Sequence, residues 1–264
     1  MFTSPCLVGN SMSVITLISD LGTRDYYVAA IKASIFRHCE KVVPIVDITH
    51  AIRPFDIKEC AFTLKNALRY FSNGSIHVAH ILSGKELLVA EYAGGYIVTF
   101  NNGLLSLMDE KREFKVYEVN EELTEDHSLL MNEAIGRVVN LLVQEYRPSD
   151  FAQLTTNYEE YRLLQPVFNP GIIRGTVVKN DAYGNAITNI TRELFERLTA
   201  GKRFVIHCGV ANVETISRRY GDVAEGDVAV LFNEADLLEI AINRGRADNL
   251  LALTPGSSVQ VVYN

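Results

Sequence analysis

The sequence predicts an α/β protein of two domains: an N-terminal α/β domain with a central, mostly parallel sheet, and a smaller C-terminal β-barrel-like domain. In the first half, apolar strand-like segments alternate with amphipathic helical segments, which is the pattern of βαβ units. In the second half, short strands follow one another with Gly, Asn and Asp between them, which favours a small barrel or sandwich. A chain of 264 residues is long enough for two such domains.

The N-terminal domain is expected to span residues 1–150. It begins with a buried strand, because residues 14–19 form a short apolar run, and an amphipathic helix over 26–38 follows. Ala93-Gly94-Gly95 separates two strand-like segments, as in a hairpin. The elements expected here are strands at 14–19, 42–48, 75–82, 86–92, 96–100 and 115–119, and helices at 26–38, 57–70 and 132–146.

The C-terminal domain is expected over residues 170–264, after a connection at 151–169. The sequence around this connection is polar, contains Pro148, Pro166 and Pro170, and is too long for a loop inside one compact domain. The elements expected beyond it are strands at 175–179, 204–208, 228–232, 238–242 and 259–263, and a short helix at 192–198.

Composition argues against several classes of protein. The formal net charge of −7 argues against a nucleic-acid partner, because phosphate binding requires a basic face. No run approaches the about 20 apolar residues of a membrane span, and residues 1–13 lack the features of a signal peptide. Cys6, Cys39, Cys60 and Cys208 are widely spaced, which suits neither a zinc site nor a disulfide framework. Free thiols favour a reducing compartment, so we expect a cytoplasmic protein.

The first candidate site lies where the strand at 14–19 ends. Asp20 follows this strand, with Gly22 close behind and Asp25 before the next helix. Ligands of open α/β sheets bind at the carboxyl ends of their strands, and a carboxylate accepts two hydrogen bonds from a diol such as ribose. The structural alternative is that Asp20 or Asp25 caps the following helix, and the two roles are compatible.

Two nearby segments have structural explanations. Asp56 and Glu59 fit a capping box, and Phe55 is placed to form a hydrophobic staple with Cys60; a stacking role for Phe55 is the second choice. His50 ends another strand, where a hydrogen-bonded loop residue is a commoner outcome than a catalyst.

The second candidate site is the run Asn180 to Asn189. Asn185 offers a donor and an acceptor to a purine edge, and Tyr183 offers an aromatic face beside Asp181. Turn chemistry alone explains Tyr-Gly-Asn equally well. His77 and His80 are three apart on one strand, so they face opposite sides and are poor joint metal ligands; no metal is expected.

Six segments, in order along the chain, carry a family resemblance. They are Ser19-Asp20-Leu21-Gly22, Val46-Asp47-Ile48-Thr49-His50, Pro54-Phe55-Asp56, Asn101-Asn102-Gly103-Leu104-Leu105, the run 181–189, and Leu231-Phe232-Asn233 with Leu238-Glu239-Ile240-Ala241. Each alone is unspecific, but their order and spacing are distinctive. The chain resembles the S-adenosyl-L-methionine (SAM) hydrolases, or SAM hydroxide adenosyltransferases, which are relatives of the fluorinase and chlorinase.

This resemblance implies the two-domain fold above and a homotrimer, with the ligand between the N-terminal domain of one subunit and the C-terminal domain of its neighbour. It implies that Asp20 holds the ribose hydroxyls, that Phe55 stacks near adenine and that Asp25 meets the methionine amino group. The remaining substrate-binding residues that it implies are Asn102, Asp181, Tyr183, Asn185, Phe232 and Glu234. SAM is the substrate, and no cofactor is implied.

The chain departs from the family in the residues that handle water. Family hydrolases carry a loop like V-D-P-G-V-G-T-x-R after the third strand, and a later His. Here Leu82 stands at the Asp, the loop is short, and it contains no Arg. His127 lies near the expected His and is the candidate catalytic residue; other substitutes are His80, Ser83 and Lys85. Glu234 replaces a small hydroxyl residue, and its charge would repel a ligand carboxylate if it pointed inward.

The resemblance therefore predicts attack of water on the 5′ carbon of SAM, giving adenosine and L-methionine. Loss of one positioned acid–base group typically costs about 10²- to 10⁴-fold in rate, while orientation and desolvation still assist the reaction. The alternative is a catalytically silent protein that binds SAM or adenosine. A halogenase is a weaker third hypothesis, because no residue here specifies a halide pocket.

Overall fold

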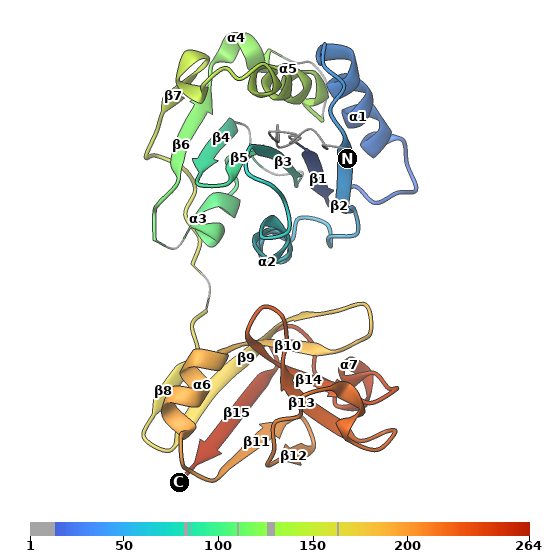
Figure 1. Cartoon of the computed structure of the whole chain (residues 1–264), viewed down its shortest axis with the longest axis vertical. Helices are drawn as coiled ribbons and strands as arrows, with labels where there is room; N and C mark the ends of the chain where they lie inside the picture. Colours follow the sequence, from blue (N-terminus) through green and yellow to red (C-terminus); the bar gives the residue numbers. More distant parts are fainter. Residues whose placement is uncertain (1–13, 82–83, 85, 110, 126–129, 163) are drawn as a thin grey trace, which may run out of the picture. The chain divides into compact units, whose positions relative to one another are not determined.

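The computed structural model describes residues 14–81, 84, 86–109, 111–125, 130–162 and 164–264. It divides into two compact units, residues 1–163 and 164–264, each with its own sheet and core (Figure 1). Each unit is described by itself below.

The first unit contains a seven-stranded sheet in the order β2-β1-β3-β5-β4-β6-β7. Its strands are β1 (Ile15–Ser19), β2 (Ile45–Thr49), β3 (Ser75–His80), β4 (Leu87–Tyr92), β5 (Gly95–Phe100), β6 (Lys115–Val119) and β7 (Ala152–Leu154). β2, β1, β3 and β5 run parallel, and β4, β6 and β7 add an antiparallel edge. The predicted hairpin is confirmed, because β4 pairs with β5 through Tyr92 and Gly95.

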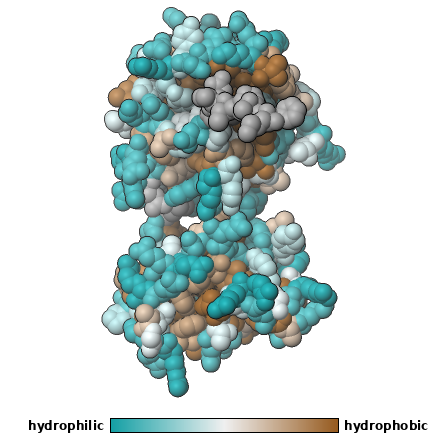
Figure 2. All heavy atoms as spheres, in the orientation of Figure 1, coloured by the Kyte–Doolittle hydropathy of each residue, from teal (hydrophilic) through white to brown (hydrophobic). Residues whose placement is uncertain are grey.

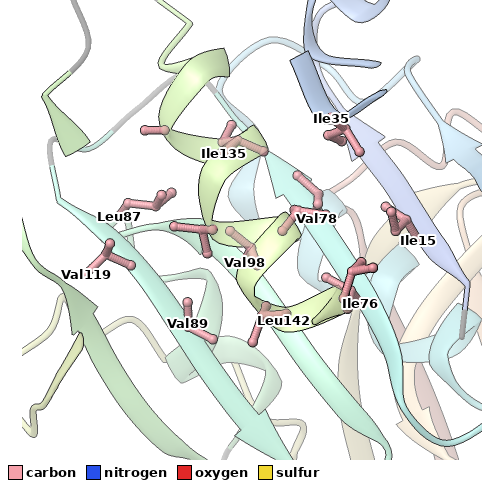
Figure 3. Close-up of a cluster of buried hydrophobic side chains, with 14 of the residues drawn as sticks. Ile15, Ile35, Ile76, Val78, Leu87, Val89, Val98, Val119, Ile135 and Leu142 are labelled. Atoms are coloured by element: carbon pink, nitrogen blue, oxygen red, sulfur yellow. The ribbon is translucent and has the colours of Figure 1, made fainter. Parts of the chain in front are cut away.

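Helices cover both faces of this sheet (Figure 1). The helices are α1 (Tyr27–His38), α2 (Ile57–Leu68), α3 (Leu104–Met108), α4 (Glu121–Thr124) and α5 (Asn132–Val143). One face packs against α1 and α5, where Ile15, Val78 and Ile135 share a core cluster (Figure 3). The other face packs Ile18 with Leu64 of α2 and Leu104 of α3. Burial on both faces explains the continuous apolar runs of the parallel strands.

The parallel strands bring several polar residues to one edge of the sheet. Asp20 follows β1, His50 follows β2, His80 ends β3 and Asn102 follows β5. β1 and β3 are paired in register up to Ser19 and His80, so these two strand ends are direct neighbours. The edge therefore collects side chains that are far apart in sequence, as a ligand site of an open α/β sheet does.

The second unit is a nearly closed antiparallel barrel. The strand order is β12-β11-β15-β9-β10-β14-β13, β8 pairs with β9, and β12 contacts β13 across the remaining opening. Its strands are β8 (Val167–Asn169), β9 (Ile172–Asn180), β10 (Ala186–Thr191), β11 (Phe204–Cys208), β12 (Ala211–Val213), β13 (Val228–Phe232), β14 (Leu237–Ile242) and β15 (Ser258–Tyr263). Its helices are α6 (Arg192–Thr199) and α7 (Ala247–Leu250).

The structure differs from the sequence-based expectation in the connection between the units and in elements that were not predicted. The segment 151–169 is not a bare connection, because β7 pairs with β6 of the first unit and β8 pairs with β9 of the second. The division between the units falls after residue 163. The strand β10 after Asn185, which pairs with β9 and β14, was not among the predicted elements. Two 3-10 turns, Pro148–Asp150 and Tyr220–Asp222, were also not predicted.

Hydrophilic residues cover most of the surface visible in Figure 2, with apolar residues between them. None of the helices in the described part of the chain combines the length and the apolar character that a membrane crossing requires. Cys39, Cys60 and Cys208 are free thiols.

His77 lies in β3, buried, with both ring nitrogens in hydrogen bonds. Nδ1 lies 2.7 Å from Thr16 Oγ1, and Nε2 lies 3.0 Å from the Tyr92 hydroxyl. Burial lowers the pKa of His77 from 6.5 to about 4. The folded protein therefore binds fewer protons here than the unfolded chain between these two pH values.

We expect the free energy of unfolding to fall as the pH drops from 6.5 towards 4, with His77 contributing up to about 3 kcal/mol of this loss. His77→Gln removes the titrating group and should flatten this part of the curve. Urea unfolding of both proteins at pH 7 and pH 4 measures the difference. Equal losses in the two proteins would contradict the assignment to His77.

Candidate functional site

Asp20 and Phe55 are brought together in the first unit. Asp20 is half-buried, and its Oδ2 accepts a hydrogen bond from the Phe55 backbone N–H at 2.8 Å. Phe55 has φ +64°, a left-handed conformation that costs energy in a residue with a Cβ, and its side chain is 63% exposed. The Asp20 carboxylate thus fixes the loop that presents an exposed aromatic ring beside it.

A second set of bonds joins the loops after β1 and β2. Gly22 donates its backbone N–H to the His50 carbonyl at 2.8 Å, and Ser19 Oγ lies 2.7 Å from His50 Nδ1. His50 Nε2 lies 3.1 Å from Asp47 Oδ1 without the alignment of a hydrogen bond. Burial raises the pKa of Asp47, but the contacts with Lys32 and His50 outweigh this effect and lower the pKa overall. His50 is therefore a bonded loop residue, as the commoner alternative predicted.

The capping predictions were partly right. Asp56 caps α2, because its Oδ1 accepts from the Glu59 N–H at 2.9 Å. The Glu59 carboxylate does not complete the capping box; it accepts instead from Arg53 N and Nε. Phe55 is not a staple, because its ring stays exposed.

The alternative that Asp20 or Asp25 caps the helix after β1 was wrong. The N-cap residue of α1 is Tyr26, not Asp20 or Asp25, and its side chain makes no capping bond. Asp25 lies exposed one residue before it. Asp20 instead braces Phe55, and the carboxylate of Asp25 faces solvent in the same loop as Asp20.

His80 ends β3, and Asn102 follows the neighbouring strand β5. His80 is fully buried, with Nε2 3.0 Å from the Leu130 carbonyl oxygen. Asn102 Oδ1 accepts from the Leu104 N–H at 3.1 Å and so shapes the start of α3. Among the described residues, neither His80 Nδ1 nor Asn102 Nδ2 has a hydrogen-bond partner. The candidates Leu82, Ser83, Lys85 and His127 lie outside the described residues.

The turn between β9 and β10 is built by Asp181 in the second unit. Asp181 Oδ1 accepts from the Tyr183 and Asn185 backbone N–H groups, and Oδ2 accepts from Asn185 Nδ2, each at 2.9 Å. Arg246 Nη1 donates to the Ala182 carbonyl at 3.2 Å. Tyr183 is 78% exposed, whereas Asn185 is buried. Asp181 therefore builds a hydrogen-bonded turn, as turn chemistry predicted, and the Tyr183 side chain on this turn is exposed.

Phe232 ends β13, where it pairs with Leu238 of β14, whereas Ala186, which follows Asn185, pairs with Ile240 further along β14. The Phe232 ring lies 5.4 Å from Phe195 and 4.6 Å from the Arg192 guanidinium carbon. Glu234 is exposed in the turn that follows.

Sequence reasoning missed a buried carboxylate behind this turn. Glu239 is 2% exposed, and it accepts hydrogen bonds from the Tyr220 hydroxyl at 2.8 Å and from Asn233 Nδ2 at 3.0 Å. Burial and the bond to Glu239 raise the pKa of Tyr220. Asn233 Oδ1 in turn accepts from the Ala235 and Leu237 N–H groups. A lone Glu inside the apolar run 237–242 was the available signal.

In the part of the chain that the structure describes, no group of three His, Cys, Asp or Glu side chains lies close enough together to hold a metal ion. The polar groups found at the two candidate sites are hydrogen-bond donors and acceptors beside aromatic rings, which suits an organic ligand with hydroxyl and amino groups.

The chain is similar to a known family along most of its length. A model of the SAM hydroxide adenosyltransferase N-terminal domain matches residues 15–139, and a model of the C-terminal domain matches residues 175–260. A relative from Methanocaldococcus jannaschii named (R)-S-adenosyl-L-methionine hydrolase is 29% identical over 69% of this chain and 68% of its own. A relative of the same name from Thermus thermophilus is 27% identical over 95% and 100%.

Two further similar proteins, one compared by sequence and one by structure, also match most of the chain. A fluorinase from an Actinoplanes species is 22% identical over 89% of this chain and 92% of its own. The crystal structure of an uncharacterized conserved protein from Thermotoga maritima has the same fold, with a TM-score of 0.84 at 24% identity, over 94% of this chain and all of that one.

Asp181→Ala should loosen the β9–β10 turn, because it removes the acceptor of three hydrogen bonds. We expect a loss of about 2 kcal/mol in the free energy of unfolding and faster hydrogen exchange at the Tyr183 and Asn185 amides. Asp181→Asn is the matched control: it keeps one oxygen for the two backbone amides and should lose less. Unchanged exchange in Asp181→Ala, measured by NMR, would contradict this account of the turn.

Proposed function

The chain belongs to the SAM hydroxide adenosyltransferase family, and on this premise we propose that it hydrolyses SAM to adenosine and L-methionine. It is an enzyme that acts on SAM. Water attacks the 5′ carbon, the C5′–S bond breaks, and the sulfonium leaves as the neutral thioether of methionine. The reaction involves no net redox change, and the sulfonium is already a good leaving group, so orientation and desolvation are the main demands on the protein.

The observation that carries this proposal is the Asp20–Phe55 pair. An ionised carboxylate has about four lone-pair positions, so the carboxylate that accepts from the Phe55 N–H is also of the type that binds the two hydroxyls of a ribose. The Phe55 ring stands exposed beside it, where a nucleoside base stacks. Asp25, exposed in the same loop, meets the methionine ammonium group.

We propose that the second unit of a neighbouring subunit supplies the other half of the pocket. Because Asn185 Nδ2 donates to Asp181, its carbonyl oxygen is directed away from Asp181 and suits the amino group of adenine. Tyr183 and Phe232 add aromatic surface. We propose that the chain forms a homotrimer in which the pocket joins Asp20 of one subunit to Asp181 of its neighbour. The free thiols favour a cytoplasmic location.

His127 is proposed to help orient the attacking water, by resemblance, and Asn102 to line the pocket with its amide. Leu82 replaces the family carboxylate, which supports slow turnover. The same replacement is the observation that favours a second candidate, a protein that binds SAM or adenosine without turnover.

Asp20→Ala decides between these candidates. We expect purified protein incubated with SAM to release adenosine and methionine in equal amounts, and Asp20→Ala to lower kcat/KM by about 10²- to 10³-fold through the loss of charged hydrogen bonds. Chromatography of both products over hours measures it. Asp56→Asn, a carboxylate change at the cap of α2 in the same region, is the control and should stay within about threefold of wild type. Intact SAM with SAM or adenosine bound to the wild-type protein would establish the silent binder instead.

Glu234→Ser should strengthen SAM binding by about 3- to 10-fold without changing adenosine binding, because Glu234 repels only the methionine carboxylate. Calorimetry with each ligand measures the two affinities, and higher salt should reduce the difference. Glu214→Ser removes an exposed carboxylate elsewhere in the second unit and is the control. Equal SAM affinity in Glu234→Ser and wild type would mean that Glu234 does not face the ligand.

A further inference from the structure

Tyr220 is an exposed aromatic residue whose hydroxyl is anchored inside the second unit. It begins the 3-10 turn Tyr220–Asp222, which lies between β12 and β13, and the residue is 45% exposed. Its hydroxyl donates to Glu239 at 2.8 Å, and Glu239 is 2% exposed in β14. The side chain is therefore fixed at its hydroxyl, while the residue remains accessible to a ligand.

Glu239 links Tyr220 to the turn between β13 and β14. Its second hydrogen bond comes from Asn233 Nδ2 at 3.0 Å. Asn233 Oδ1 in turn accepts from two backbone N–H groups of the turn, at 2.9 and 3.2 Å, and so shapes the segment that carries Glu234. One buried carboxylate thus ties Tyr220 to the residue that precedes Glu234, which is one of the candidate binding residues.

The β9–β10 turn lies near Tyr220 as well. In the ladder of β14 and β10, Glu239 lies opposite Ile187, in the strand that leads out of that turn. Burial raises the pKa of Tyr220, and the bond and charge of Glu239 and the charges of Asp181 and Glu234 raise it further. Tyr220 therefore lies between the two turns that carry the candidate binding residues of the second unit.

The surroundings of Tyr220 favour a positively charged group. Three carboxylates act on its hydroxyl, as described above. The neighbouring cation, Arg219, already has a partner, because its Nε donates to Asp222 at 3.2 Å. An aromatic face attracts a cation, and nearby negative charges add to this attraction. SAM carries positive charge on its sulfonium and on its ammonium group, whereas adenosine carries none.

We propose that Tyr220 is a further SAM-contacting residue, whose ring recognises the positively charged methionine portion of SAM, and that Glu239 is its positioning residue. The proposal rests on the SAM binding proposed above. The exposed ring supplies the face for the cation. Glu239 is buried and does not touch the ligand, but it holds Tyr220 and Asn233 in place. Tyr220 therefore makes the site prefer a cationic adenosyl compound to neutral adenosine.

Tyr220→Leu tests the contact, because leucine keeps an apolar side chain but removes the aromatic face. We expect the SAM dissociation constant to rise by about 3- to 30-fold and that of adenosine to stay within about twofold of wild type. Calorimetry with each ligand measures both constants. Phe168→Leu is the matched control and should leave both unchanged. Phe168 is 49% exposed in β8, which pairs with the start of β9, at the opposite end of that strand from Asn180.

Glu239→Ala and Glu239→Gln test the positioning role. Alanine removes both acceptors, so SAM affinity should fall about as far as in Tyr220→Leu. Glutamine keeps an oxygen for Asn233 Nδ2 and offers an N–H to the Tyr220 oxygen, so the SAM dissociation constant should return to within about threefold of wild type. SAM binding as weak in Glu239→Gln as in Glu239→Ala would mean that Glu239 acts through its charge and does not position Tyr220.

A purely structural role for Tyr220 would weaken SAM and adenosine binding alike, so an equal loss for both ligands, or no loss for SAM, would overturn the proposal. If Tyr220→Leu does not fold, NMR of the wild-type protein replaces it: the Tyr220 ring protons must shift with SAM and not with adenosine, and any other result overturns the proposal equally. If the wild-type protein binds neither ligand, the proposed function itself fails, and that result is distinct from a protein that binds SAM and is indifferent to Tyr220.

Discussion

The parallel pairing of β2, β1, β3 and β5 is the constraint on which the candidate site of the first unit depends. Parallel strands end at the same edge, and each end must turn into a helix or loop whose backbone needs new hydrogen-bond partners. Here side chains supply many of them: Asp20 accepts from Phe55, and Asn102 accepts from Leu104. The groups that complete the backbone are thus the same groups that we propose to meet the ligand.

In the second unit too, one side chain has two roles: the Asp181 carboxylate builds a turn and orients the Asn185 amide. Asp181 receives two backbone N–H groups and the side chain of Asn185, so the exposed Tyr183 is held at a defined place. Behind it, the buried Glu239 ties Tyr220 to Asn233 and fixes the turn that carries Glu234. A ligand that meets either turn meets side chains already ordered, which lowers the entropy cost of binding.

Much of the fold was accessible from the sequence, because apolar periodicity and the Gly-Gly hairpin are local signals. The alternation of strands and helices in the first unit and the antiparallel barrel of the second were predicted within a few residues. β10 was missed because its Thr and Asn residues favour turns locally, and it forms a strand only by pairing with β9 and β14. Likewise, β7 and β8 are three residues each and gain their stability from their neighbours.

The sequence by itself determined the two domains, the fold class and the residues that mark the family, because the order and spacing of strands, helices and motifs can be read directly from the sequence. The tertiary structure decided what those residues do: that Asp20 braces Phe55 and does not cap a helix, and that His50 is engaged by Ser19. It also decided that His80 keeps a buried, unpartnered nitrogen among the described residues. Hydrogen bonds between residues 31 to 61 positions apart follow from strand packing, which no local pattern encodes.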